Sequence, residues 1–387
     1  MIYRDLCGEK VSLLGFGAMR LPVKDGEVDY NETEKMLDCA IAAGVNYIDT
    51  AWPYHSGDSE RVVSRILAKY PRGSYFLADK YPGHQTADSY DPAGLFEEQL
   101  KKCNVDYFDF YLLHNVNENS IGVYKDPKWG IIDYFIEQKK AGRIRHLGFS
   151  THGGVKMIKE FLDEYGEYME FCQIQFNYLD DTLQNAGEKY ELLTERAIPV
   201  IVMEPVRGGK LASLDEGIEN KLREMRTGTS TASWAFRWLQ SYSNISVILS
   251  GMSNMEQLCD NLATFDKEEV LTEEERAYLA DVAEGMKDSL PCTGCAYCVD
   301  GCPIGLDIPN LISIYNELRF QSNIVSAMRL EGADEATLPS ACISCGACSS
   351  ICPQKIDIPA AMSDLANRIS KMPKWADVCR ERAALQK

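Results

Sequence analysis

Hydrophobic and polar residues follow two alternating patterns along the first three-quarters of the chain. Short apolar runs rich in β-branched and aromatic residues are separated by stretches such as "YNETEKMLDCAIAAG" (30–44) and "SERVVSRILAKY" (59–70). The first pattern is typical of buried strands and the second of amphipathic helices. The predicted strands lie at 13–17, 45–49, 75–80, 108–114, 145–150, 172–176, 199–205 and 246–251. Eight strands with intervening helices favour an α/β fold, a closed (β/α)8 TIM barrel.

Two further local patterns frame this barrel. "YRDL" and "KVSL", joined by "CGE", predict a small hairpin across one barrel end. A later helix is expected to begin near Thr272, because Thr272 and Glu275 have the spacing of a capping box. The composition then changes at "KDSLPC", so we expect the barrel domain to occupy residues 1–285.

The remainder of the chain contains an internal repeat. The run "CTGCAYCVDGCP" precedes "LDIPNLI", and the run "CISCGACSSICP" precedes "IDIPAAM". Both runs have the spacing C-x2-C-x2-C-x3-C-P that is known from two-cluster bacterial ferredoxins. The 39 residues between Cys302 and Cys342 look helical. We therefore expect a mainly α-helical, di-cluster ferredoxin-like domain over 286–365 and a helical tail over 366–387.

The cysteine spacing predicts two [4Fe–4S] clusters. Each run would supply three thiolates to one cluster, and the fourth thiolate would come from the partner run. The expected ligand sets are Cys292, Cys295, Cys298 and Cys352 for one cluster, and Cys342, Cys345, Cys348 and Cys302 for the other. Zinc is the alternative, but zinc sites use two CxxC pairs or cysteine and histidine mixtures. The other cysteines are interpreted as packing residues: Cys7, Cys39, Cys103, Cys172, Cys259 and Cys379.

Four polar residues fall at or just after predicted strand ends: Asp49, Tyr54, Lys80 and His114. Active sites of TIM barrels lie at this face. Taken singly, Asp49 could cap a helix, Lys80 could be solvated, and His114 could bridge backbone groups. Their occurrence in consecutive βα units favours a catalytic set.

The same residues carry a resemblance to a known family. "DTAWPYHSGDSE" is similar to the aldo-keto reductase signature D-T-A-x-x-Y-x-x-G-x-S-E, and "ADK" and "LLHN" match its lysine and histidine strands. The whole chain resembles the subgroup of aldo-keto reductases with a C-terminal 4Fe-4S ferredoxin-type domain. The resemblance implies an oxidoreductase that reduces an aldehyde, ketone or sugar with NADP(H) or NAD(H).

This chemistry gives each of the four residues a role. Tyr54 would be the general acid, and the Lys80 ammonium would lower the tyrosine pKa from its usual value of about 10. Asp49 would hold Lys80 in place, and His114 would orient the substrate oxygen.

The segments after strands seven and eight are the candidate cofactor site. "LGFGAMR" fails the Rossmann fingerprint because its last position is Arg20, whereas TIM barrels tend to bind phosphate after these two strands. After strand seven, the candidates are Pro205, Gly208, Gly209 and Lys210. The resemblance further implies that Ser150 and Gln173 hold the nicotinamide carboxamide. It assigns to the adenosine end Gly251, Ser253, Gln257 and Asn261. Ordinary helix capping is the alternative for this last segment.

Two departures from the family pattern bear on the cofactor. Met203 stands where relatives often place an aromatic ring on the nicotinamide. Gly251 and Gln257 stand where a lysine and an arginine often fix a 2′-phosphate, so a strict NADPH preference is not implied. Near the same mouth, Trp52, His55 and His152 could shape the substrate pocket, with surface packing as the alternative. No flavin motif is evident.

Charge and composition restrict the partners. The net charge of −18 argues against nucleic acid and anionic membrane surfaces, and it would suit a basic redox partner protein as well as a small carbonyl or alcohol substrate. No signal peptide and no apolar run near about 20 residues is evident, so we expect a cytoplasmic protein with reduced thiols.

Three functional hypotheses remain at this point. The first is a carbonyl reductase, which we prefer because a complete acid–base set is hard to explain without chemistry. The second is an electron-transfer protein that passes electrons between nicotinamide and a redox partner through the clusters. In the third, the clusters are purely structural.

Overall fold

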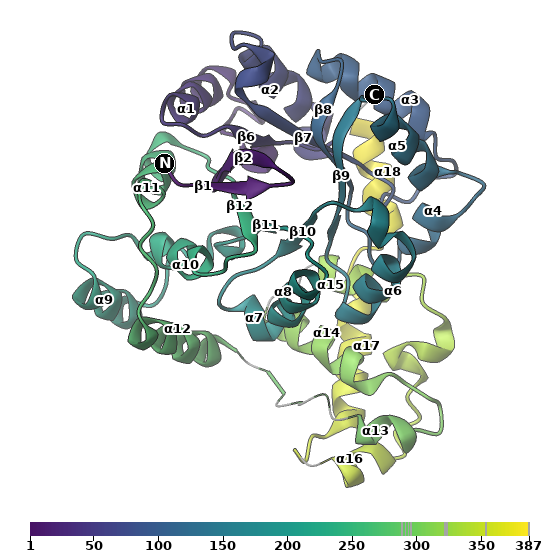
Figure 1. The fold of residues 1–387 in the computed structure, drawn as a ribbon. Coiled ribbons are helices and arrows are strands. Elements are labelled where there is room, and N and C mark those ends of the chain that lie inside the picture. Colours follow the sequence, from purple (N-terminus) through teal and green to yellow (C-terminus); the bar gives the residue numbers. More distant parts are fainter. Residues whose placement is uncertain are drawn as a thin grey trace.

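The first part of the chain folds into a closed barrel of eight parallel strands, as the computed structural model shows (Figure 1). The structure describes residues 1–287, 289–290, 292, 294, 296–320, 324–352 and 354–385. The barrel strands are β3 (Leu14–Gly17), β6 (Tyr47–Asp49), β7 (Phe76–Tyr81), β8 (Phe108–Leu113), β9 (Ile144–Thr151), β10 (Cys172–Gln175), β11 (Val200–Met203) and β12 (Ile245–Ser250). Each strand pairs with the next one along the chain, and β12 pairs with β3. The predicted TIM barrel is confirmed.

Helices follow the strands and cover the outside of the barrel (Figure 1). They are α1 (Tyr30–Ala42), α2 (Ser59–Leu67), α3 (Pro92–Cys103), α4 (Ile121–Lys125), α5 (Ile131–Lys140), α6 (Val155–Tyr165), α7 (Asp180–Leu183), α8 (Ala186–Glu195), α9 (Glu216–Met225), α10 (Thr231–Gln240) and α11 (Met255–Thr264). In α1, Asp29 caps the first turn by accepting from the Glu32 amide, and the apolar face buries Met36 and Leu37. This is the amphipathic pattern expected from the sequence.

A hairpin closes the end of the barrel at which the strands begin. Its strands are β1 (Tyr3–Leu6) and β2 (Glu9–Ser12), which pair antiparallel as predicted. Leu6 and Val11 are fully buried in an apolar cluster that includes Tyr47, the first residue of β6. The opposite end, where the strands finish, is therefore the mouth of the barrel. A second small hairpin joins β4 (Val23–Lys24) to β5 (Glu27–Val28).

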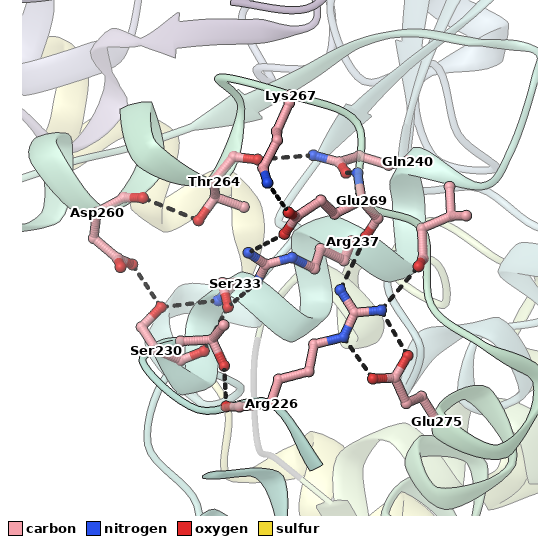
Figure 2. Close-up of polar contacts among 12 residues, drawn as sticks. Arg226, Ser230, Ser233, Arg237, Gln240, Asp260, Thr264, Lys267, Glu269 and Glu275 are labelled. Atoms are coloured by element: carbon pink, nitrogen blue, oxygen red, sulfur yellow. Dashed lines mark hydrogen bonds and ion pairs between the residues drawn. The ribbon is translucent and has the colours of Figure 1, made fainter.

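The last barrel helices are joined by a network of charged and polar side chains (Figure 2). Helix α12 (Glu273–Met286) begins at Thr272 with the predicted capping box. Glu275 of this helix accepts two hydrogen bonds from Arg226, at 2.5 and 2.7 Å. Ser230, which caps α10, donates to Asp260 of α11 at 2.6 Å. This network therefore joins α10, α11 and α12 to one another on the outside of the barrel.

The C-terminal part is mainly helical, as predicted. Its helices are α13 (Tyr297–Asp300), α14 (Ile308–Phe320), α15 (Ile324–Met328), α16 (Ala347–Ile351), α17 (Ile358–Ser370) and α18 (Trp375–Leu385). The sequence repeat is a structural repeat, because α14 and α17 begin with equivalent Ile-Pro pairs and pack together around Ile308 and Ile358. Helix α17 continues past residue 365, where the sequence placed the end of the ferredoxin-like domain.

This helical part contacts the barrel mouth with one end and carries the cysteine runs at the other (Figure 1). Trp375, the first residue of α18, donates from Nε1 to the His84 carbonyl at 2.8 Å. Met328 of α15 lies with its sulfur 3.9 Å from the Asn115 amide nitrogen. Figure 1 shows α13 and α16 at the far end, away from the barrel. None of the helices within the described ranges is long and apolar enough to cross a membrane.

Candidate functional site

The four candidate catalytic residues meet at the barrel mouth. Asp49 is the last residue of β6, Lys80 lies near the end of β7, and His114 directly follows β8. Tyr54 begins the short 3-10 helix η2 (Tyr54–Gly57), which follows β6. The Lys80 ammonium donates to Asp49 Oδ1 at 2.6 Å and to the Thr50 carbonyl at 2.7 Å.

The ring of Tyr54 lies near both the lysine and the histidine. Lys80 Nζ is 5.0 Å from the centroid of the Tyr54 ring, and the rings of Tyr54 and His114 meet edge-on with centroids 6.1 Å apart. The structure thus brings together the residues that the sequence grouped.

Burial sets the protonation of these groups. Burial raises the pKa of Tyr54 to about 12, although the Lys80 ammonium opposes this by its charge and by a hydrogen bond. Lys80 thus lowers the tyrosine pKa as expected, but desolvation outweighs the cation, and the net pKa is raised instead of decreased. Burial alone would lower the pKa of Lys80, but Asp49 and Tyr54 outweigh it and raise that pKa. Burial, together with nearby His84 and Lys80, lowers the pKa of His114 well below its usual value, so its imidazole is neutral.

Three histidines lie close together at the barrel mouth. The rings of His84 and His114 have centroids 4.4 Å apart, and His152 is close enough to affect both electrostatically. The Nδ1 atoms of His84, His114 and His152 are buried and have no hydrogen-bond partner among the described residues. Buried polar atoms are rarely left unpaired, so these are positions at which a bound molecule would satisfy hydrogen bonds. The sequence reasoning missed His84, although its place just after β7 was a signal.

Two other residues near the mouth have structural contacts instead. His55 accepts a hydrogen bond from the Leu21 amide at 3.0 Å. Trp52 packs under Lys102, whose ammonium lies 3.5 Å from the ring centroid and also pairs with Glu60 at 3.0 Å. Of the three residues considered for the substrate pocket, His152 is the one that retains an unsatisfied buried atom.

The residues assigned to the nicotinamide carboxamide are neighbours. Ser150 of β9 and Gln173 of β10 lie side by side in the strand register. Gln173 is buried, and its Oε1 has no partner within the described part of the chain, while Nε2 faces the Met203 sulfur at 3.4 Å. The Ser150 hydroxyl accepts from the Asn115 amide at 2.8 Å. A free carbonyl oxygen at this place fits the amide hydrogens of a carboxamide.

A cavity of about 260 Å³ opens between the ends of β11 and β12. The candidate cofactor residues that line it are Pro205, Gly208, Gly209, Gly251, Ser253, Gln257 and Asn261. Side chains would obstruct this space at Gly251, where an added Cβ would lie 3.1 Å from Arg20. Gln257 Oε1 accepts from the Ser253 amide at 2.8 Å and so shapes the turn before α11. The cavity has the glycine-bordered form that the phosphate-rich part of a dinucleotide requires.

Lys210 is not part of this cavity. Its ammonium instead lies 5.0 Å from the ring centroid of Phe320, which belongs to α14. The sequence could not place it, because the contact comes from the other domain. Arg20 lines the cavity in its stead and forms an ion pair with Glu204 at 3.0 Å.

One of the two expected cluster ligand sets lies around a single cavity. Its lining includes Cys302 from the first run with Cys342, Cys345 and Cys348 from the second, amid apolar side chains such as Ile308 and Met362. This donor set fits the expected [4Fe–4S] cluster. Within the described residues, no three such donors lie close enough together to hold a single metal ion.

The second set is described in part. Cys298 is buried, and Cys292 and Cys352 pack against the same apolar cluster, whereas Cys295 lies outside the described residues. The cysteines interpreted as packing residues form no disulfide, and Cys103 and Cys172 are buried in the barrel.

Comparisons with known proteins agree with this arrangement. The aldo/keto reductase family model matches residues 13–284, and a 4Fe-4S dicluster domain model matches residues 291–356. An uncharacterised oxidoreductase of Bacillus subtilis, YqkF, is 27% identical over 296 residues, which are 68% of this chain and 90% of that protein. An NADH-specific methylglyoxal reductase of Escherichia coli is 25% identical over 325 residues, 72% of this chain and 96% of that protein.

A solved structure is similar as well. The holo form of aldo-keto reductase AKR11C1 from Bacillus halodurans superimposes with a TM-score of 0.59 at 27% identity, over 73% of this chain and 96% of that one. With the family model covering most of the chain, this oxidoreductase belongs to the aldo/keto reductase family and carries a C-terminal 4Fe-4S dicluster domain.

Proposed function

We propose that this protein reduces a small carbonyl compound by hydride transfer from a nicotinamide, with Tyr54 as the proton donor. The observation that carries the proposal is the buried ion pair of Lys80 and Asp49 beside Tyr54, with the neutral imidazole of His114 at the same place. A buried lysine and aspartate side by side serve no packing purpose that apolar residues could not serve better.

The four residues divide the work of moving one proton. Tyr54 is protonated at neutral pH and donates its proton to the carbonyl oxygen as that oxygen becomes an alkoxide. The Lys80 ammonium then stabilises the tyrosinate that remains, and Asp49 holds Lys80 in position. His114, which is neutral, hydrogen-bonds the same oxygen and orients it. When bound, the reduced nicotinamide supplies the hydride to the carbonyl carbon.

We infer that NAD(H) is preferred to NADP(H). Among the described residues that line the cavity, Arg20 is the one basic side chain, and Glu204 already pairs with it. Asp260 adds further negative charge to the lining. A 2′-phosphate brings about two negative charges at neutral pH and would meet no free cation here. The Escherichia coli relative is described as NADH-specific.

Steady-state kinetics of the anaerobically purified protein test this function. We expect NADH oxidation with methylglyoxal, which the Escherichia coli relative's description makes the first probe. Tyr54→Phe should lower kcat by about 10²- to 10⁴-fold, the usual contribution of a general acid. Tyr70→Phe is the matched control, since its hydroxyl bonds Asp38 at 2.6 Å on the barrel exterior. Binding of NADH without turnover on a broad carbonyl panel would refute the proposal.

For the C-terminal part, we propose a domain over 286–365 that holds two [4Fe–4S] clusters, in a cytoplasmic protein. Electron exchange with a partner protein is the second candidate function. It is favoured by exposed apolar residues within the second cysteine run, with Ile343 at 60% and Ile351 at 51% exposure. Each cluster takes one electron, so exchange with a hydride donor requires a flavin or a radical step. An anaerobic NADH titration should therefore leave the cluster absorbance unbleached unless flavin or a partner is added.

A further inference from the structure

A buried cation without a counter-ion lies between the barrel and the C-terminal domain. Lys189 of α8 is 4% exposed, and its side chain forms no ion pair or hydrogen bond with any residue that the structure describes. Taking a charge out of water is costly, so buried lysines in folded proteins normally have an acidic partner. Lys189 therefore offers a donor that a bound anion could use.

The acid of the C-terminal domain that acts electrostatically on Lys189 already has a cationic partner. Glu317 of α14 is buried and accepts from Arg329 at 2.5 Å and from Ser326 at 2.6 Å. Arg329 in turn keeps a buried Nε with no partner among the described residues. Glu317 and Arg329 therefore cancel in charge, and Arg329 retains an unused donor.

The acidic side chains of the barrel near Lys189 also have other hydrogen-bond partners. Asp180 is buried and pairs with Arg207, and it accepts further hydrogen bonds from Asn177 at 2.7 Å and from Gln175 at 2.8 Å. Glu118, which acts on Lys189 only electrostatically, is exposed and accepts from a backbone amide. Lys189 thus has no direct counter-ion among the described residues at this interface, and burial lowers the pKa of its ammonium.

Lys189 lies close to the proposed reaction centre. The charges of Lys189 and Arg329 both act electrostatically on His152, which follows β9, and His152 acts in the same way on His114. Asn115, the residue after His114, connects the same parts by direct contact. Its Oδ1 accepts from the His152 amide at 3.3 Å, and its Nδ2 faces Met328, the neighbour of Arg329.

We propose that Lys189, assisted by Arg329, binds the carboxylate of a substrate whose carbonyl group is reduced at Tyr54 and His114. The substrate class is then an oxo acid or an aldehyde that carries a carboxylate, with the C-terminal domain completing its binding site. A single cation without a direct counter-ion matches a monoanion better than a phosphate dianion. This inference rests on the proposed function for the reaction itself, but its binding site can be tested separately.

The kinetic test compares acids with their neutral esters. The probes are 4-carboxybenzaldehyde and 4-oxobutanoate, each against its methyl ester, with NADH as the reductant. The wild-type protein should favour each acid in kcat/KM by about 10- to 100-fold, the range expected for a charge-assisted hydrogen bond. Lys189→Met should remove this preference while ester turnover persists, and Lys189→Arg should retain part of it. Lys125→Met, which removes a surface lysine paired with Glu164, is the matched control.

A binding measurement keeps the inference falsifiable if turnover is absent. The alcohol product 4-(hydroxymethyl)benzoate should raise the thermal midpoint of the wild-type holoprotein, whereas its methyl ester should not. In Lys189→Met the acid should give no increase, and the midpoint without ligand should be higher because an unpaired buried charge is gone. Equal binding of acid and ester by the wild-type protein, or an acid preference that survives in Lys189→Met, overturns the inference. Acid binding without any turnover overturns the proposed reaction instead.

Discussion

Replacing Lys80 by methionine removes the buried ammonium at nearly constant side-chain length. The pair that it breaks has side-chain exposures of 0% for Lys80 and 3% for Asp49, with an N–O distance of 2.6 Å. Removing one partner of such a pair costs about 3–5 kcal/mol, since the other charge stays buried. Asp49 Oδ2 already has no partner in the described residues, so nothing nearby compensates. We expect the free energy of unfolding of the barrel to fall by this amount at pH 8.

The loss should shrink in acid, because the Asp49 carboxyl can take up a proton. Burial raises the pKa of Asp49, and Lys80 opposes that increase in the wild-type protein. Without Lys80, the folded-state pKa lies further above the unfolded value of about 3.9. A group with a raised folded-state pKa costs stability as the pH rises through that range, at about 1.4 kcal/mol per unit of difference. The penalty of Lys80→Met should therefore be smaller at pH 5 than at pH 8.

Urea unfolding of the anaerobic holoprotein, followed by far-UV circular dichroism at both pH values, measures these quantities. The double variant Asp49→Asn with Lys80→Met should regain most of the stability, because neither charge remains, yet both variants should be impaired in carbonyl reduction. Lys69→Met, which breaks an exposed pair with Asp38, should change stability by no more than about 1 kcal/mol. If Lys80→Met is as stable as the wild type, or if the double variant is no more stable than the single one, the reasoning about this buried pair is refuted.

Three further predictions concern the pH profile, the clusters and the tail. Burial raises the pKa of Tyr54 to about 12 and lowers the pKa of His114, so Tyr54 stays protonated and His114 stays neutral. In steady-state assays, kcat/KM should therefore be flat from about pH 6 to 9. A change in kcat/KM centred near about pH 6.5, the usual pKa of histidine, would contradict this. Cys302→Ser should lower the iron content from about eight to about four atoms per chain by elemental analysis, and full retention would exclude the assigned ligand set. Trp375→Ala removes the hydrogen bond and the ring stacking to His84, which should cost about 3–5 kcal/mol of local stability. We expect KM to increase severalfold and α18 to become more susceptible to limited proteolysis. An unchanged KM would show that the tail does not shape the pocket.

Much of the site was accessible from the sequence because its positions are determined locally. Asp49, Lys80 and His114 each end a predicted strand, and Tyr54 follows one, so the closure of a parallel barrel brings them to one face. The cysteine runs were recognisable for the same reason, since thiolate spacing is a property of a single loop.

Other features depend on contacts between segments that are far apart in the chain. Lys210 was expected at the phosphates, but in this structure it does not line the cavity and lies beside Phe320 of the C-terminal domain, whereas Arg20 lines the cavity. His84 carried no family motif, and its position against Trp375 depends on how the two domains meet.

The sequence by itself determined the order of strands and helices, the capping of α12 and the identity of the acid–base and thiolate groups, because hydrophobic periodicity and residue spacing act over a few neighbouring residues. Only the tertiary structure decided the electrostatic balance. Whether Tyr54 holds its proton, and whether Lys189 has a counter-ion, depends on how deeply each group is buried and which distant charges reach it. Those quantities arise when the barrel closes and the helical domain packs against its mouth.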